Sequence, residues 1–176
     1  IPNSPNPFYV VSKEGLFLKK STLLGISMTK QDTMPKNLGE LGYAKGFFSY
    51  EAPLIPAEIC AQIVDFFKRI WDKHRAEAEV ILTARIERVD GFPKIVEWRV
   101  FIPTQKVSGG GVESVYEPKH IAKGHQVVGT MHSHCNFSAY HSGTDTGDAK
   151  GFDGVHFTIG YVDTKKPQVV CMVSMN

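Results

Sequence analysis

Two histidines, a serine and an aspartate in the second half of the chain constrain its fold more than any other feature. The order is His132, Ser133, His134, then seven residues, Ser142, two residues and Asp145. Side chains alternate along a strand, so an extended segment would point His132 and His134 to the same face. The fold must then return Asp145 to that face, which places a strand end beside the start of the next helix.

The residues on either side of this motif predict those two elements. Val127-Val128-Gly129-Thr130 predicts a buried strand. Ser142-Gly143-Thr144-Asp145 predicts a helix start, with Ser142 or Thr144 as its N-cap. Two imidazole nitrogens and a carboxylate oxygen suit Zn²⁺ and leave its fourth tetrahedral position open, as in catalytic zinc sites.

This motif resembles the signature of the JAB/MPN (JAMM) zinc metalloproteases, many of which are deubiquitinating isopeptidases. The resemblance implies His132, His134 and Asp145 as ligands of one catalytic zinc, and Ser142 as a hydrogen-bond donor to the tetrahedral intermediate. Cys135 stands where many members carry proline, a position that binds no metal in the family. Strand alternation also places Cys135 opposite His134.

The resemblance further implies a glutamate on an early strand as the general acid/base, and two glutamates compete for this role. An apolar stripe over residues 56–73 predicts a helix, and the apolar, β-branched segment that follows predicts a strand up to Ala84. Glu77 fits the family order of helix, glutamate and apolar strand best, and Glu79 is the alternative. Both share one strand face because they are two residues apart. The one that is not the base is expected to be a solvated carboxylate at a strand edge.

The expected fold class is α+β, of the α/β/α type. The resemblance implies the MPN/JAMM fold, a mixed, curved β-sheet flanked by helices with layering like that of cytidine deaminases. An extra N-terminal β-hairpin is predicted around the Glu14-Gly15 turn. We divide the chain into an N-terminal extension, residues 1–50, and a metalloprotease domain, residues 51–176. Strands are predicted at residues 78–88, 95–102, 112–116, 126–132, 155–162 and 168–174.

Four segments are predicted to lack regular structure. We expect a flexible arm at residues 1–7, turns over 26–45, a mobile loop or bulge at 108–111 and a surface loop at 146–154. In the family, a loop in the region of 146–154 often grips the substrate tail, which makes Phe152 either a substrate contact or a core residue. His141, beside Ser142, is a further candidate for substrate contact.

Composition argues against several classes of protein. The net charge of +2 gives no electrostatic case for nucleic-acid binding. No apolar stretch is long enough to span a bilayer, and no secretory signal is visible. The three cysteines lie far apart, and Cys60 and Cys171 are predicted to be buried thiols. We therefore expect a cytoplasmic protein in a reducing compartment.

The motif looks most like the prokaryotic, deubiquitinase-like branch of the family. That resemblance implies cleavage of the amide after the C-terminal tail of a ubiquitin-like protein, with the associated activating and conjugating enzymes as partners. The alternatives are a cell-wall or phage-tail-type peptidase of the same family and a non-catalytic MPN scaffold. A zinc deaminase is disfavoured because the chain lacks a His-x-Glu and a Pro-Cys-x-x-Cys element.

Overall fold

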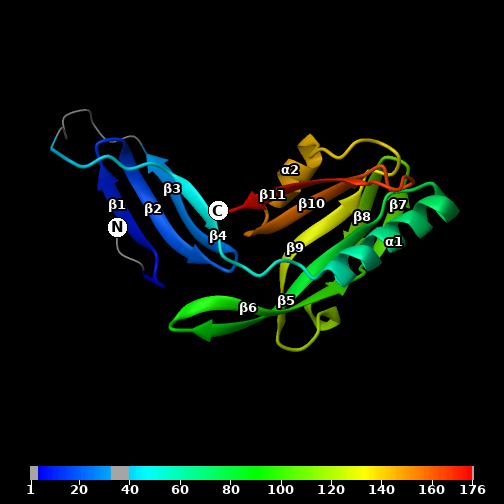
Figure 1. Cartoon of the computed structure of the whole chain (residues 1–176), viewed down its shortest axis with the longest axis horizontal. Coiled ribbons are helices and arrows are strands. Elements are labelled where there is room, and N and C mark those ends of the chain that lie inside the picture. The colour runs from blue at the N-terminus through cyan, green and yellow to red at the C-terminus, as the bar shows by residue number, and fades with distance from the viewer. Residues whose placement is uncertain (1–3, 33–39, 176) are drawn as a thin grey trace. The chain divides into compact units, whose positions relative to one another are not determined.

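A computed structural model describes residues 4–32 and 40–175. The described residues form two α-helices, a short 3-10 helix (η1, Pro118–His120) and three β-sheets (Figure 1). The α+β class is therefore confirmed. The chain divides into two compact units, Ile1–Pro53 with Ile86–Ile95, and Leu54–Arg85 with Val96–Asn176. The domain boundary between residues 50 and 51 stays a prediction.

The first unit contains a four-stranded antiparallel sheet in chain order, larger than the predicted hairpin. Its strands are β1 (Phe8–Ser12), β2 (Gly15–Thr22), β3 (Gly25–Asp32) and β4 (Phe47–Tyr50). The predicted hairpin is the β1–β2 pair, and Phe17, Met28 and Ala44 form a buried cluster. The expectation of turns over residues 26–45 was wrong where β3 pairs with β2. Residues 33–39, and residues 1–3 of the predicted arm, lie outside the described residues.

A five-stranded mixed sheet has the order β11-β10-β9-β5-β6 (Figure 1), and all of it except residues 86–95 of β5 and β6 belongs to the second unit. The strands are β5 (Glu79–Val89), β6 (Phe92–Phe101), β9 (His125–Ser133), β10 (Gly154–Gly160) and β11 (Gln168–Ser174), which confirms five predicted strands. β9 and β10 are parallel, whereas β5 pairs antiparallel to β9 and β11 antiparallel to β10. Parallel neighbours need a crossover, and here that connection carries helix α2 (Gly143–Ala149).

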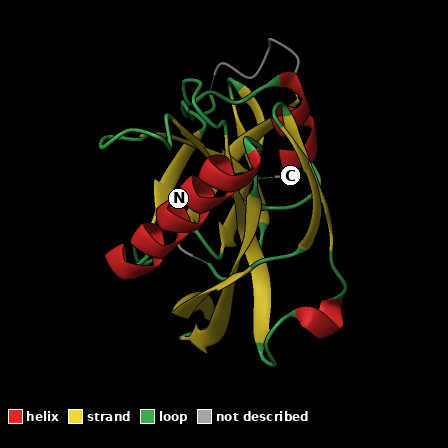
Figure 2. Cartoon of the chain, turned by 90° about the vertical axis from the view of Figure 1, so that its right-hand side faces the viewer, coloured by secondary structure: helices red, strands yellow, loops and turns green. Residues whose placement is uncertain are grey.

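The predicted long helix is α1 (Ala57–His74), seen in front of the strands in Figure 2. Its apolar stripe buries Ile63 and Phe67 completely or nearly so. The helix ends at Arg75, whose left-handed φ of 52° lets its N–H donate to the Trp71 carbonyl. Residues 80–84 of β5 are all buried, so both faces of this strand are covered. In the described part of the chain, no helix is both long and apolar enough to cross a membrane.

Three local expectations were wrong. Residues 108–111 are the tight turn between β7 (Thr104–Ser108) and β8 (Gly111–Val115), which form their own two-stranded sheet. The surface loop predicted for residues 146–154 begins as helix, because α2 continues to the buried Ala149. Cys171 is exposed, since β11 is the edge strand of its sheet, and Cys60 is only partly buried.

Candidate metal centre

The end of β9 brings the two histidines to one site. His132 lies in β9, where it pairs with Glu79 of β5 on one side and Thr158 of β10 on the other. His134 follows the last β9 residue, and its N–H donates to the Ile159 carbonyl at 2.8 Å, which extends the pairing with β10. The two imidazole rings are 5.1 Å apart, centroid to centroid. The predicted shared face is therefore present.

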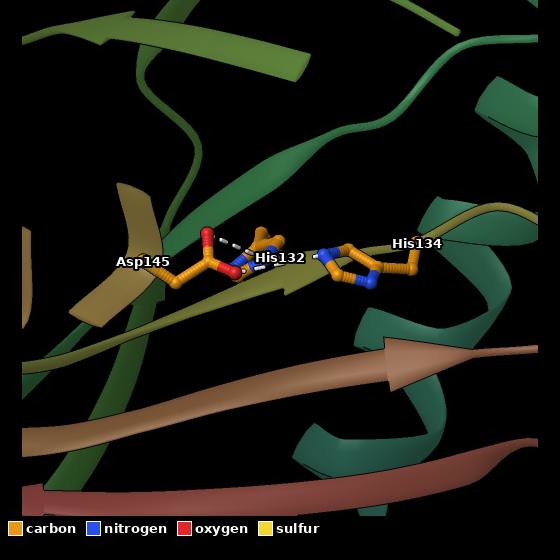
Figure 3. Close-up of side chains that lie close together, drawn as sticks. All are labelled: His132, His134 and Asp145. Atoms are coloured by element: carbon orange, nitrogen blue, oxygen red, sulfur yellow. Dashed lines mark ion pairs between the residues drawn. The ribbon is translucent and has the colours of Figure 1, made fainter. Parts of the chain in front are cut away.

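The start of α2 supplies the carboxylate. Ser142 is the N-cap, and its hydroxyl accepts from the Asp145 N–H at 3.2 Å, while the Ser142 N–H donates to Asp145 Oδ2 at 2.6 Å. This capping box holds the carboxylate toward the histidines (Figure 3). Asp145 Oδ1 is 3.3 Å from His132 Nε2, and Oδ2 is 3.7 Å from His134 Nε2. Thr144, the alternative cap, does not take this role.

The three side chains could hold one metal ion. Their ligand atoms all lie within 4.8 Å of one another. Burial lowers the pKa of His132 to about 4, so its imidazole is neutral near pH 7 and keeps a lone pair for a metal. Burial would raise the pKa of Asp145, but the Ser142 amide and hydroxyl, with both histidines, bring it below its ordinary value. Two imidazoles and one carboxylate make a donor set that fits zinc.

Both candidate glutamates line the same cleft, of about 610 Å³, as the three ligands. Glu77 is only 8% exposed, and burial followed by the charge of Asp145 raises its pKa to about 7. Burial also raises the pKa of Glu79. Neither glutamate is the solvated strand-edge carboxylate that the sequence suggested for one of them.

Two sets of hydrogen bonds hold the backbone at these glutamates, and neither was predicted from the sequence. Strand β7 provides the first: the Glu77 N–H donates to the Ser108 carbonyl at 2.8 Å, and the Gln105 amide bonds both backbone groups of Glu79. Ser133 provides the second set: its hydroxyl accepts from the N–H of Ala78, the residue between the two glutamates. The sequence carried a signal only for Ser133, which lies between the ligand histidines.

The loop after His134 is held against the end of β10. The Tyr161 N–H donates to the Phe137 carbonyl and the Val162 N–H to the Cys135 carbonyl, at 2.8 and 2.9 Å. Gly160 allows this approach, because a Cβ there would lie 2.3 Å from the Ala139 nitrogen. The loop therefore turns directly back toward Ser142.

Cys135 lies outside the ligand cluster. It is fully buried at φ 47°, a value that proline cannot adopt. Burial, followed by the charge of Glu77, raises the pKa of its thiol to about 11, whereas a metal-binding cysteine must be deprotonated.

His141 and Phe152, the two candidates for substrate contact, lie in different surroundings. His141 lines the cleft. Phe152 is outside the residues that line it and packs edge-to-face on His156, with ring centroids 4.9 Å apart. The packing role predicted for Phe152 is thus the one its contacts support.

Two comparisons relate the chain to known proteins. The comparison with curated proteins returns no match. The family described as prokaryotic homologs of the JAB domain matches residues 55–173, a span that includes α1, both glutamates and the full motif from His132 to Asp145. The match covers more than half of the chain, which therefore belongs to the family of prokaryotic homologs of the JAB domain.

Proposed function

We propose that the protein is a zinc-dependent isopeptidase that cleaves the amide bond after the C-terminal tail of a ubiquitin-like protein. The observation that carries the proposal is the meeting of His132, His134 and Asp145 with a buried glutamate in one open cleft. An MPN scaffold without catalytic activity would need neither the ligand set nor the glutamate beside it.

His132, His134 and Asp145 would hold the zinc. When bound, zinc supplies Lewis-acid activation of water and of the substrate carbonyl. The capping box keeps Asp145 ionised and oriented, so the carboxylate is pre-formed for a cation.

Glu77 is the proposed general acid/base. A carboxylate with a pKa near 7 can take a proton from water and return it to the leaving amine. The charge of Asp145 is the second of two causes that raise the pKa of Glu77, but the smallest of the three that raise the pKa of Glu79. Glu77 is thus coupled more strongly to the ligand set, while the backbone of Glu79 is held by two hydrogen bonds with the Gln105 side chain.

Ser142 is the proposed donor to the oxygen that gains negative charge. Its hydroxyl accepts from the Asp145 N–H and lines the cleft, so a substrate oxygen bound there can receive the hydroxyl proton. A fixed donor at this oxygen stabilises the transition state more than the ground state. The serine does not need to attack, so no covalent enzyme intermediate forms.

We expect the extended substrate tail to bind along the edge of strand β8. Among the described strands, β8 pairs only with β7, and its residues Gly111, Val112, Glu113 and Ser114 line the cleft. An extended peptide can add to such an edge through backbone hydrogen bonds, with little demand on its side chains. A flexible tail ahead of the scissile amide fits this arrangement.

The test uses a ubiquitin-like protein fused through its C-terminal tail to a reporter. We expect the zinc-loaded enzyme to cut at the tail junction, a chelator to abolish the cleavage, and serine- or cysteine-directed covalent inhibitors to leave it intact. Cleavage of a cell-wall peptide with the fusion left whole would keep the metalloprotease and reject the ubiquitin-like substrate. Cleavage of the fusion in the presence of chelator would reject the zinc mechanism itself.

A further inference from the structure

A buried threonine connects a metal-ligand histidine with a second histidine of the cleft. Thr158, on β10, is fully buried and pairs in register with His132. Its Oγ1 lies 3.1 Å from His141 Nδ1 and 3.4 Å from His132 Nε2. One hydroxyl therefore serves two imidazoles, of which only His132 belongs to the ligand cluster.

The hydroxyl has a single proton to share between these two rings. Once His132 Nε2 gives its lone pair to a metal, that nitrogen can no longer accept the Thr158 proton. The proton is then available to His141 Nδ1, which leaves the proton of the neutral His141 ring on Nε2. In the metal-free protein, His132 competes for the same hydroxyl proton.

The second ring nitrogen of His141, Nε2, has no hydrogen-bond partner among the described residues. This nitrogen is shielded from solvent, and the residue lines the cleft beside Ser142. Burial lowers the pKa of His141, so the ring is neutral near pH 7. A shielded N–H without an acceptor is unfavourable, and a bound substrate oxygen would remove that cost.

We propose that His141 is a catalytic residue that donates a second hydrogen bond, from Nε2, to the carbonyl oxygen of the amide being cleaved. Thr158 acts as its positioning residue, because it sets both the ring orientation and the tautomer. This inference rests on the proposed amidase function, since it assigns a role at the same reacting carbonyl. It adds a donor that the motif of two histidines, serine and aspartate does not contain.

The tautomer can be tested without any substrate. Nitrogen-15 NMR of histidine-labelled protein should show His141 protonated at Nε2 in the zinc-loaded form, with Thr158→Val losing this preference while zinc stays bound. Protonation at Nδ1 in the zinc-loaded wild type would overturn the proposal. Because this measurement needs no cleavage, it decides the question even where the ubiquitin-like fusion is not cut and the proposed function fails.

Kinetics and a small probe test the contact with the carbonyl oxygen. We expect His141→Ala to lower kcat by roughly 10²-fold, the usual effect of one lost donor, with KM and zinc content nearly unchanged. His141→Gln should recover part of kcat because its amide N–H can donate, whereas His141→Phe should not. Acetohydroxamate, which presents a carbonyl oxygen at a zinc site, should bind at least tenfold more weakly to zinc-loaded His141→Ala.

His74→Ala, at the exposed end of α1, is the matched histidine control. An effect of His141→Ala confined to KM, or equal activity of the glutamine and phenylalanine variants, would reject a donor at the reacting carbonyl. Unchanged acetohydroxamate binding in His141→Ala would reject it as well.

Discussion

Ser133 and Ala78, 55 positions apart in the chain, are joined by two hydrogen bonds. The Ala78 N–H donates to Ser133 Oγ at 3.0 Å, and the Ser133 N–H donates to the Ala78 carbonyl at 2.9 Å. Ser133 lies between the two ligand histidines, and Ala78 lies between the two candidate glutamates. This pair therefore fixes the end of β9, with its two histidines, relative to the two candidate glutamates.

Replacing Ser133 with alanine should weaken both the fold and the reaction. The buried Ala78 N–H would lose its acceptor, which generally costs about 1–3 kcal/mol. We expect a lower free energy of unfolding in denaturant titrations and slower turnover, because Glu77 loses part of its anchoring. Ser138→Ala, in the exposed loop after His134, is the control. Equal stability of Ser133→Ala and wild type would show that the hydroxyl does not hold this junction.

The ligand set can be tested by elemental analysis. We expect about one zinc per chain after metal-replete expression, and none in the His132→Ala/His134→Ala double variant. Zinc should raise the melting temperature of the wild type, because a ligand that binds only the folded state stabilises it. The double variant should show no such shift, while His74→Ala should behave like wild type. Full zinc retention by the double variant would mean that the metal is held elsewhere.

The two glutamates can be separated by conservative substitution. Glu77→Gln should keep zinc and fold but lose activity by about 10²-fold or more, as expected for a missing acid/base. Glu79→Gln should retain much more activity. Glu58→Gln, on the exposed side of the first turn of α1, controls for the loss of one carboxylate. The reverse order, with Glu79→Gln inactive and Glu77→Gln normal, would move the base by two residues.

The raised pKa of Glu77 predicts how the stability of the metal-free protein depends on pH. The folded-state pKa is about 7 against an ordinary 4.5. The fold thus favours the protonated form, and this contribution is present below pH 4.5 and lost as the pH rises through 7. Glu77→Gln cannot ionise, so its advantage in unfolding free energy over wild type should grow between pH 4.5 and 7 and then level off.

Denaturant titrations of the metal-free proteins at several pH values measure this advantage. Glu113→Gln, an exposed carboxylate of the same cleft, controls for a change in net charge. A difference between Glu77→Gln and wild type that stays constant with pH would show that Glu77 is not held in its protonated form.

Gly160→Ala tests the loop that returns the chain to Ser142. The added Cβ would lie within 2.3–2.4 Å of backbone atoms of Phe137 to Ala139, so this loop must move. We expect weaker zinc binding and reduced activity, since the loop connects His134 to the capping box of Asp145. Gly147→Ala, whose Cβ would meet nothing within 4 Å, is the matched control. If Gly160→Ala bound zinc as tightly as the wild type, the loop would not be needed to position the metal ligands.

The extent to which the sequence predicted the site differs from residue to residue. The cluster of His132, His134 and Asp145 was predicted because each residue depends on local order: strand alternation places the two histidines on one face, and the cap residue Ser142 orients Asp145 within one helical turn. Residues 108–111 were predicted to be a mobile loop or bulge rather than a tight turn, because glycines suit all three. Pairing of Ser108 with Gly111 decided between the two.

By itself, the sequence determined α1, the strands of the five-stranded sheet and the residues of the candidate metal cluster, because hydrophobic period, β-branched segments and a capping serine act within a few residues of one another. Only the tertiary structure decided that both glutamates enter the cleft, that β7 clamps them through Ser108 and Gln105, and that Thr158 reaches His141. These contacts join strands that are neighbours in space but distant in sequence. Their partners are chosen by sheet register and burial, which no local pattern contains.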